Sequence, residues 1–208
     1  MNPVLAVEHK VGSLPWSYRD LADAFIKFAT QKPSPIHGPG LNNSVYFLGT
    51  NWDDPPKGQN RASVQVDHNA RLFINPIIAI VSVEEHTNEF PANPTEKQIM
   101  GRTEDIINDS DAEITIRYED GKTSDYGIGQ LQRVQVPYRK RQQLEIGKGV
   151  WPKYPDGGKV NACWDGYFIA CENLKIGKHE VELIADSPYF GKPGHRYHSS
   201  FTYDLTVR

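Results

Sequence analysis

The feature that most restricts the fold of this chain is the alternation of apolar and polar residues in short segments. Residues 199–207 are the clearest case. Successive side chains of a β-strand point to opposite faces, so this pattern predicts a strand with one buried side and one solvent-facing side. The apolar set is Phe201, Tyr203, Leu205 and Val207, and the polar set is Ser200, Thr202, Asp204 and Thr206.

Similar segments recur along the chain and are separated by turn signals such as the EDG sequence at 119–121. The 17 glycines and 15 prolines supply most of these breaks. About eight short strands at this spacing predict an all-β fold, or a β fold with two short helices, arranged as an antiparallel β-sandwich or jelly roll. The expected strands are 45–48, 62–66, 72–83, 112–118, 131–136, 167–171, 179–185 and 199–207.

Two segments carry helix signals. Ser17 with Asp20 three residues later predicts a capped helix over about 17–31. Thr95 with Gln98 is a capping box that predicts a second helix ending near residue 108. We expect residues 34–41 (SPIHGPGL) to form a loop, and Pro76 to cause an edge, bulge or bend within 72–83.

The length of 208 residues suits one domain, which we expect at 16–208 as a single β-sandwich. Residues 1–15, with Pro3 and Pro15, are expected to form an extended N-terminal arm. With 23 basic and 26 acidic residues, the net charge of −3 gives no support for nucleic-acid binding. The longest apolar run, Ile77 to Val81, is too short to span a bilayer. No signal peptide is visible in the first residues, MNPVLAVEHKVG, and the compartment stays open.

The two cysteines, Cys163 and Cys171, lie eight residues apart in a segment that reads as one strand. An extended strand separates such positions by roughly 26 Å, which forbids a disulfide between them. We therefore expect two free, buried thiols.

Several motifs resemble, in order and spacing over about 16–185, a group of mostly bacterial β-rich proteins of unassigned function. That group has a VWFLAGT-like strand, an Arg-rich strand, an FFPI-like strand and a DGYW…PG.HTI hairpin. Here the matching segments are SVYFLGT (44–50), RASVQV (61–66), LFINPIIAIVSVEE (72–85) and WDGYFIACENLKIGKHEVEL (164–183). The resemblance implies a β fold and a secreted or envelope-associated location, but no mechanism. Ser63 stands where relatives often have a cysteine.

A polar cluster directly follows the most apolar segment. Glu84 and His86 share one face of an extended chain, and a third metal ligand would come from Glu89 or Asp165. This set predicts a divalent-metal site, the one cofactor we consider, in a metal-assisted hydrolase or lyase. The alternative is a solvated strand end whose charges protect an edge from aggregation.

Aromatic residues gather in loops rich in glycine and proline: Trp52, Trp151, Tyr154 and Tyr189. Rings beside acids, amides and lysines suit a sugar-binding surface, because the ring stacks on the apolar face of a pyranose while polar groups bond its hydroxyls. The alternative is that these rings pack beneath their loops. No complete catalytic set is visible, so the leading hypothesis is a non-catalytic module that binds a glycan or a protein.

A third hypothesis is a structural protein in which the arm at 1–15 pairs with the sheet edge of another copy, giving a homo-oligomer. The three hypotheses share one expectation about partners. They need no nucleic acid and no membrane span.

Overall fold

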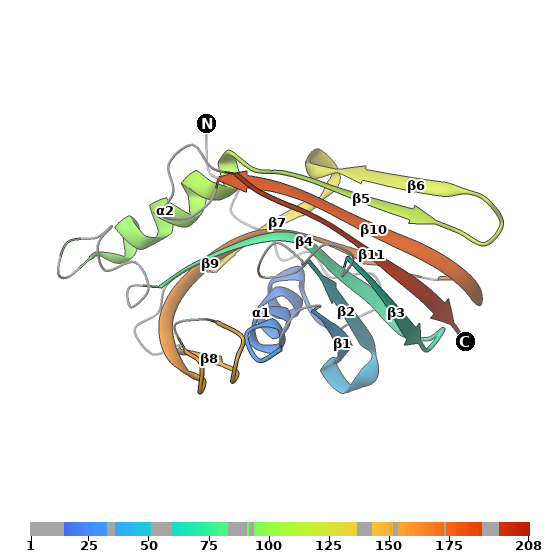
Figure 1. Ribbon diagram of the computed structural model, residues 1–208, viewed down its shortest axis with the longest axis horizontal. Coiled ribbons are helices and arrows are strands. Elements are labelled where there is room, and N and C mark those ends of the chain that lie inside the picture. The colour runs from blue at the N-terminus through green and yellow to red at the C-terminus, as the bar shows by residue number, and fades with distance from the viewer. Residues whose placement is uncertain are drawn as a thin grey trace.

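The computed structural model describes residues 15–32, 36–50, 60–82, 91, 94–136, 143–151, 154–172, 174–188 and 196–208. Within these residues two β-sheets pack face to face, accompanied by two α-helices (Figure 1). This confirms the prediction of a β fold with two short helices, and the two facing sheets form a sandwich. The arm predicted at 1–15 lies almost wholly outside the described residues.

One sheet has six strands and lies in the middle of the molecule (Figure 1). Its strands run in the order β1-β2-β4-β9-β7, and β8 pairs with the first residues of β9. Their bounds are His37–Gly40 (β1), Val45–Gly49 (β2), Arg71–Ser82 (β4), Gln132–Val136 (β7), Gln143–Ile146 (β8) and Gly158–Cys171 (β9).

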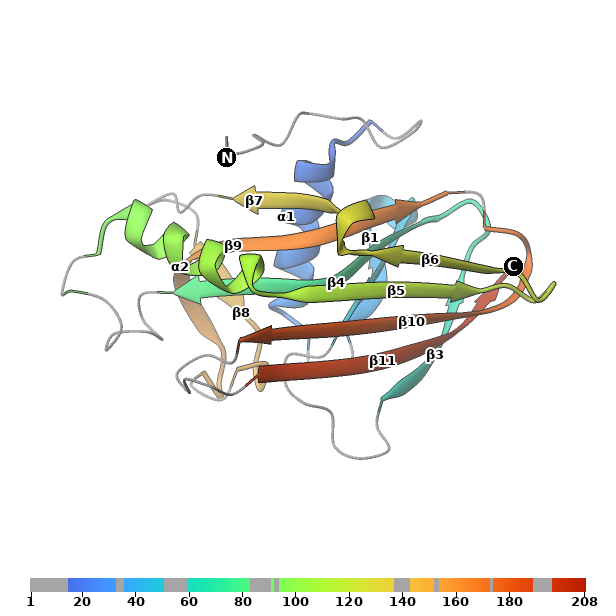
Figure 2. The same ribbon diagram turned by 90° about the horizontal axis from the view of Figure 1, so that it is seen from above.

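The other sheet has five strands in the order β3-β11-β10-β5-β6. Figure 2 shows that the axes of its long strands are roughly aligned with those of β4 and β9. The bounds are Arg61–Val66 (β3), Asp111–Arg117 (β5), Thr123–Gly127 (β6), Gly177–Pro188 (β10) and Arg196–Val207 (β11).

Most strand pairs of the sandwich are antiparallel, as predicted, but two pairs are parallel. β2 pairs with β4, and β3 with β11, in parallel. The chain leaves the six-stranded sheet after β2, forms β3 in the other sheet and returns as β4. Such a crossover lets two strands of one sheet run in the same direction, which a tight hairpin cannot do.

Three strands escaped prediction: β1, β6 and β8. The expected loop at 34–41 contains β1. Its two glycines and its proline indicate a loop, because these residues usually interrupt the hydrogen bonds between strands. As an edge strand β1 tolerates Pro39. Gly40 is needed for close packing, because a Cβ there would lie 2.2 Å from the Phe47 ring.

Both predicted helices form with the predicted caps. In α1 (Tyr18–Ala29) the Ser17 hydroxyl accepts the Asp20 N–H, and the Asp20 carboxylate accepts the Ser17 N–H. In α2 (Glu96–Asn108) Thr95 and Gln98 make the same reciprocal pair. None of the described helices is both long and apolar enough to span a bilayer.

Two apolar clusters hold the layers together. One lies between the sheets, where α2 also contributes side chains. The second lies between α1 and the opposite face of the six-stranded sheet. This sheet is therefore buried on both faces, which explains why β4 is almost continuously apolar. In β4, Leu72 and Ile74 face the other sheet, while Phe73 faces α1.

The bulge predicted by Pro76 is present in β4. Ile74 pairs with Ile169 and Ile77 with Tyr167, so three steps along β4 match two along β9. The extra residue reverses the inward face from even to odd numbers. Asn75, 2% exposed, fills the gap, because its side-chain Nδ2 donates to the carbonyl oxygens of Ile77 at 2.9 Å and Tyr167 at 2.8 Å.

Replacing Asn75 with alanine should lower the free energy of unfolding by about 1–3 kcal/mol, because two carbonyl groups beside the bulge lose their donor. The measurement is urea unfolding followed by tryptophan fluorescence. A change below about 0.5 kcal/mol, as is usual for surface substitutions, would contradict this role.

Candidate functional site

The outer face of the five-stranded sheet lies open to solvent. In β10 and β11 alternate side chains are buried, and those between them point away from the core. Among the described residues no helix or strand lies against this face, whereas α1 covers the outer face of the six-stranded sheet (Figure 1). The described part of the molecule therefore has one helix-covered side and one open, polar side.

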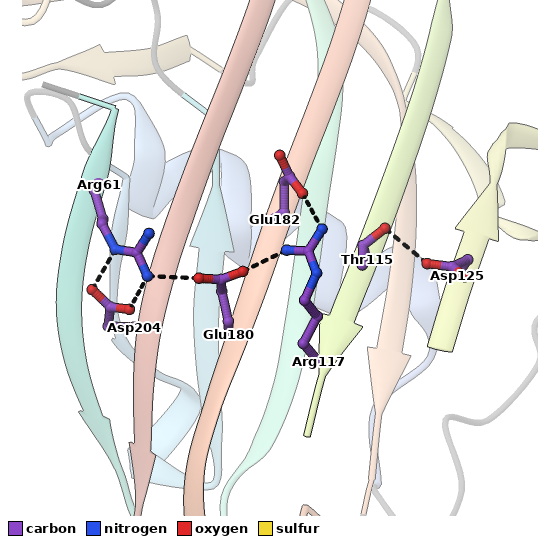
Figure 3. Close-up of polar contacts among 7 residues, drawn as sticks. All are labelled: Arg61, Thr115, Arg117, Asp125, Glu180, Glu182 and Asp204. Carbon is purple, nitrogen blue, oxygen red and sulfur yellow. Dashed lines mark hydrogen bonds and ion pairs between the residues drawn. The ribbon is translucent and has the colours of Figure 1, made fainter. Parts of the chain in front are cut away.

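A ladder of charged side chains crosses this open face (Figure 3). Arg61 donates from Nε to Asp204 Oδ2 at 2.7 Å and from Nη2 to Glu180 Oε2 at 2.6 Å. Arg117 donates from Nη1 to the other oxygen of Glu180 and from Nη2 to Glu182 Oε2 at 2.8 Å. We call these five residues the charge ladder. It joins β3, β11, β10 and β5.

Strand register creates the ladder. On β10, Glu180 lies directly between Asp204 of β11 and Arg117 of β5. Directly opposed side chains on one face of a sheet lie close enough to form ion pairs. The neighbouring Thr115 hydroxyl donates to Asp125 Oδ1 at 2.9 Å, extending the polar row to β6 (Figure 3).

The ladder alters the acidity of its members. Hydrogen bonds from Arg61 hold the pKa values of Asp204 and Glu180 below their ordinary range, with Arg117 adding to the effect on Glu180. The same bonds raise the pKa values of both arginines. Because the side chains remain solvated, these ion pairs fix geometry more than they stabilise the fold.

Replacing Arg61 with glutamine should raise the pKa values of both Glu180 and Asp204, because their charge-assisted hydrogen bonds are lost. The lowered pKa values in the parent protein stabilise the fold above the ordinary carboxyl pKa, and this contribution disappears as pH falls through the lowered values. Carboxyl-carbon NMR titration measures the change. Unaltered titration of both groups would contradict the ladder.

A second group of charges lies at the far end of β10 and β11. Arg196 pairs through Nε with Asp186, and donates from Nη2 to the Asp109 carbonyl oxygen at 2.8 Å. His198 Nδ1 lies 3.7 Å from Asp186 Oδ2. Since Asp109 is the C-terminal cap of α2, this group joins the open sheet to the helix.

Two of the four predicted aromatic ligand-binding residues lie in the described part of the chain. Trp52 and Tyr189 lie outside the described residues. Trp151 is 8% exposed and packs in the cluster under α1, with its ring centre 6.3 Å from that of the half-buried Tyr154. The structure thus brings Trp151 and Tyr154 together, but leaves little of the tryptophan ring accessible to a ligand.

The proposed metal ligands Glu84, His86 and Glu89 also lie outside the described residues. The described part of the chain contains no group of three or more His, Cys, Asp or Glu side chains that could hold a metal ion. Asp165, the alternative third ligand, is fully buried and engaged with Arg133.

Arg133 binds both carboxylate oxygens of Asp165 through Nε, at 3.0 and 3.1 Å, while its Nη2 lies 2.5 Å from Oδ2. Gln135 Nε2 bridges Asp165 Oδ2 at 3.3 Å and Glu104 Oε1 at 2.8 Å. Arg133 Nη1 donates to Asn108 at 2.7 Å. Burial raises the pKa of Asp165, and Arg133 opposes this shift. The group fastens α2 to β7 and β9.

Both cysteines are free, as predicted, and both lie on β9. Cys163 is buried and Cys171 half-buried. Burial raises the pKa of Cys171 to about 12, which disfavours the reactive thiolate.

Sequence reasoning missed the charge ladder, although part of its signal was present. The alternation in 179–185 and 199–207 implied polar outward positions, including Glu180 and Asp204. Their partners could not be read from that pattern, because Arg61 is 119 residues from Glu180 and 143 from Asp204.

Comparisons with known proteins assign no family. No protein-family model matches this sequence, and no curated protein matches it. Solved structures similar to it include a cysteine protease inhibitor from Entamoeba histolytica, with 12% identity over 79% of this chain and 96% of the inhibitor chain. Its TM-score is 0.26, too low to support any inference about this protein.

Proposed function

We propose that the protein is a non-catalytic β-sandwich module that binds a partner protein on the open face of the five-stranded sheet. The observation that carries this proposal is the contrast between the two outer faces. One is covered by α1, and the other presents the charge ladder to solvent. A sheet face with fixed charges of both signs suits a complementary protein surface.

The ladder favours specific recognition, because its side chains are already held in position. Glu180 is gripped from both sides by Arg61 and Arg117. A partner would therefore bind without first ordering these long side chains, which reduces the entropy lost on association. Alternating charges also reject partners with a mismatched pattern and accelerate encounter with a matched one.

Site-specific photo-cross-linking in the source cells tests the proposal. A benzophenone amino acid at Ser63 or Thr202, both on the open face, should give a discrete cross-linked species. The same amino acid at Glu145 of β8 provides the control position. Absence of a species specific to the open face would contradict the proposal.

Charge reversal sharpens the experiment. The double variant Arg61→Glu with Arg117→Glu should abolish the cross-link. It replaces both positive charges of the ladder with negative charges, which would repel the partner surface that the arginines attract. Lys148→Glu with Lys159→Glu changes the net charge equally, using exposed lysines whose acidic partners, Asp156 and Glu145, lie outside the ladder. Equal loss in both variants would indicate a general charge effect and contradict recognition by this face.

A further inference from the structure

Two turns at one end of the sandwich line a pocket of about 240 Å³ that is partly open to solvent. One wall comes from the turn between β5 and β6, and the other from the connection between β9 and β10, both at the right-hand end of Figure 1. The lining residues are Tyr118, Glu119, Asp120, Lys175, Ile176 and His179.

His179 fastens the two walls together. This side chain is 7% exposed, and its Nε2 lies 2.7 Å from the Lys175 carbonyl oxygen, so this nitrogen carries the proton and donates. Its Nδ1 accepts the backbone N–H of Glu119 at 3.4 Å. The Tyr118 ring packs edge-on against the imidazole, with centres 5.5 Å apart. The two walls of the pocket are thus joined by one buried residue, His179.

The second turn is also held by the side chain of Glu119 from the first turn. Gly177 has φ 144°, and a Cβ there would lie 2.2 Å from a carboxylate oxygen of Glu119. That same oxygen accepts the Lys178 N–H at 3.1 Å. Leu174 is buried in the core between the sheets. These contacts explain the L-x-x-G-K-H sequence at 174–179 as a rigid pocket wall.

The lining combines apolar surface with both signs of charge. Ile176 lines the pocket and is 68% exposed. Large hydrophobic side chains are otherwise at least partly covered in the described part of the chain. Lys175 Nζ lies 3.7 Å from Asp120 Oδ2, and Lys122 Nζ lies 3.5 Å from the same oxygen. The charges balance locally, so neither a free cation nor a phosphate is strongly favoured.

We propose that this pocket binds one neutral, hydroxyl-rich ring, such as a single monosaccharide unit of a glycan. Tyr118 and Ile176 offer the apolar contact that one face of a sugar ring needs. Asp120 accepts hydrogen bonds from hydroxyls, and Lys175 donates to them. The volume lies below the range of about 300–1,000 Å³ typical of drug-sized ligands, which fits one ring. The pocket lining shares no residue with the charge ladder, although Tyr118 and His179 adjoin Arg117 and Glu180 in the chain.

Titration with glucose, galactose, mannose and N-acetylglucosamine, followed by amide NMR shifts, tests the proposal. At least one sugar should give saturable shifts at Asp120, Gly121 and Ile176, with a dissociation constant on the order of 1 mM. Asp120→Ala should weaken binding about tenfold, because charged hydrogen bonds to hydroxyls are lost. Asp156→Ala, which removes an acid paired with Lys148 in another turn, should leave binding unchanged.

Three results would overturn the proposal. The first is the absence of saturable shifts with every sugar of the panel. The second is equal weakening by Asp120→Ala and Asp156→Ala. The third is a response of the same amides to inorganic phosphate but to no sugar, which would assign the pocket to an anion. None of these bears on cross-linking at the open face, so the two proposals fail separately.

Discussion

Replacing Arg133 with methionine should lower the free energy of unfolding by about 3–5 kcal/mol, the largest effect expected of any single charge in the described part of the chain. Methionine fills similar space but leaves the fully buried Asp165 without its cationic partner. Gln135 alone would then donate to this carboxylate, from 3.3 Å. The measurement is urea unfolding at neutral pH.

The pH dependence of this loss identifies its cause. Burial already raises the pKa of Asp165, and without Arg133 the pKa should rise further. A buried acid with a raised pKa destabilises the fold as pH rises above the ordinary aspartate value, because ionisation is then favoured only in the unfolded chain. The loss caused by Arg133→Met should therefore be larger at neutral pH than near that ordinary value.

Two further variants provide controls. Adding Asp165→Asn to Arg133→Met removes the buried charge together with its partner and should restore much of the stability. Arg117→Met removes an arginine from the exposed ladder and should change stability by less than about 1 kcal/mol. If Arg133→Met has no larger effect than Arg117→Met, the Asp165 pair does not fasten α2 as inferred.

Replacing Phe73 with alanine should lower the free energy of unfolding by about 3–5 kcal/mol. Phe73 is fully buried under α1, where its ring stacks on Phe168 with centres 5.2 Å apart. It also contacts Phe47 at 6.2 Å and Tyr18 at 5.9 Å, measured between ring centres. Truncation removes this apolar contact and leaves a cavity that rigid neighbouring strands cannot fill.

Urea unfolding measures the loss, and hydrogen exchange locates it. Since Phe73 supports α1, the amides of this helix should exchange faster in the variant, while those of β10 and β11 change less. Phe73→Leu retains most of the volume and should lose less than about 1.5 kcal/mol. Similar losses for alanine and leucine would show that the ring does not set the packing under α1.

The structural findings affect the three functional hypotheses in different ways. The two proposals of binding, on the open face and in the pocket, concern places other than the aromatic loops. The metal-site hypothesis rests on Glu84, His86 and Glu89, which lie outside the described residues, and loses Asp165 as a free ligand. The assembly hypothesis rests on the arm at 1–15, so comparing the solution mass with and without this arm tests it.

Local rules explain the successful predictions. The capping boxes at Ser17 and Thr95 involve residues three apart, so a short window of sequence contains everything that fixes them. The bulge at Pro76 follows from a missing backbone N–H, also a local property. Local rules also explain why β1 was not predicted. They treat glycine and proline as residues that interrupt strands, whereas an edge strand that packs closely can contain both.

The sequence by itself determined both helices, all the described strands except β1, β6 and β8, and the buried side of the strands whose apolar and polar residues alternate. These properties follow from the alternation of side chains and from caps a few residues long. Only the tertiary structure decided which strands are neighbours, and hence that Arg61 meets Glu180, that Arg133 meets Asp165 and that Trp151 lies in the core. Strand pairing joins residues far apart in the chain, and no local pattern specifies its partners.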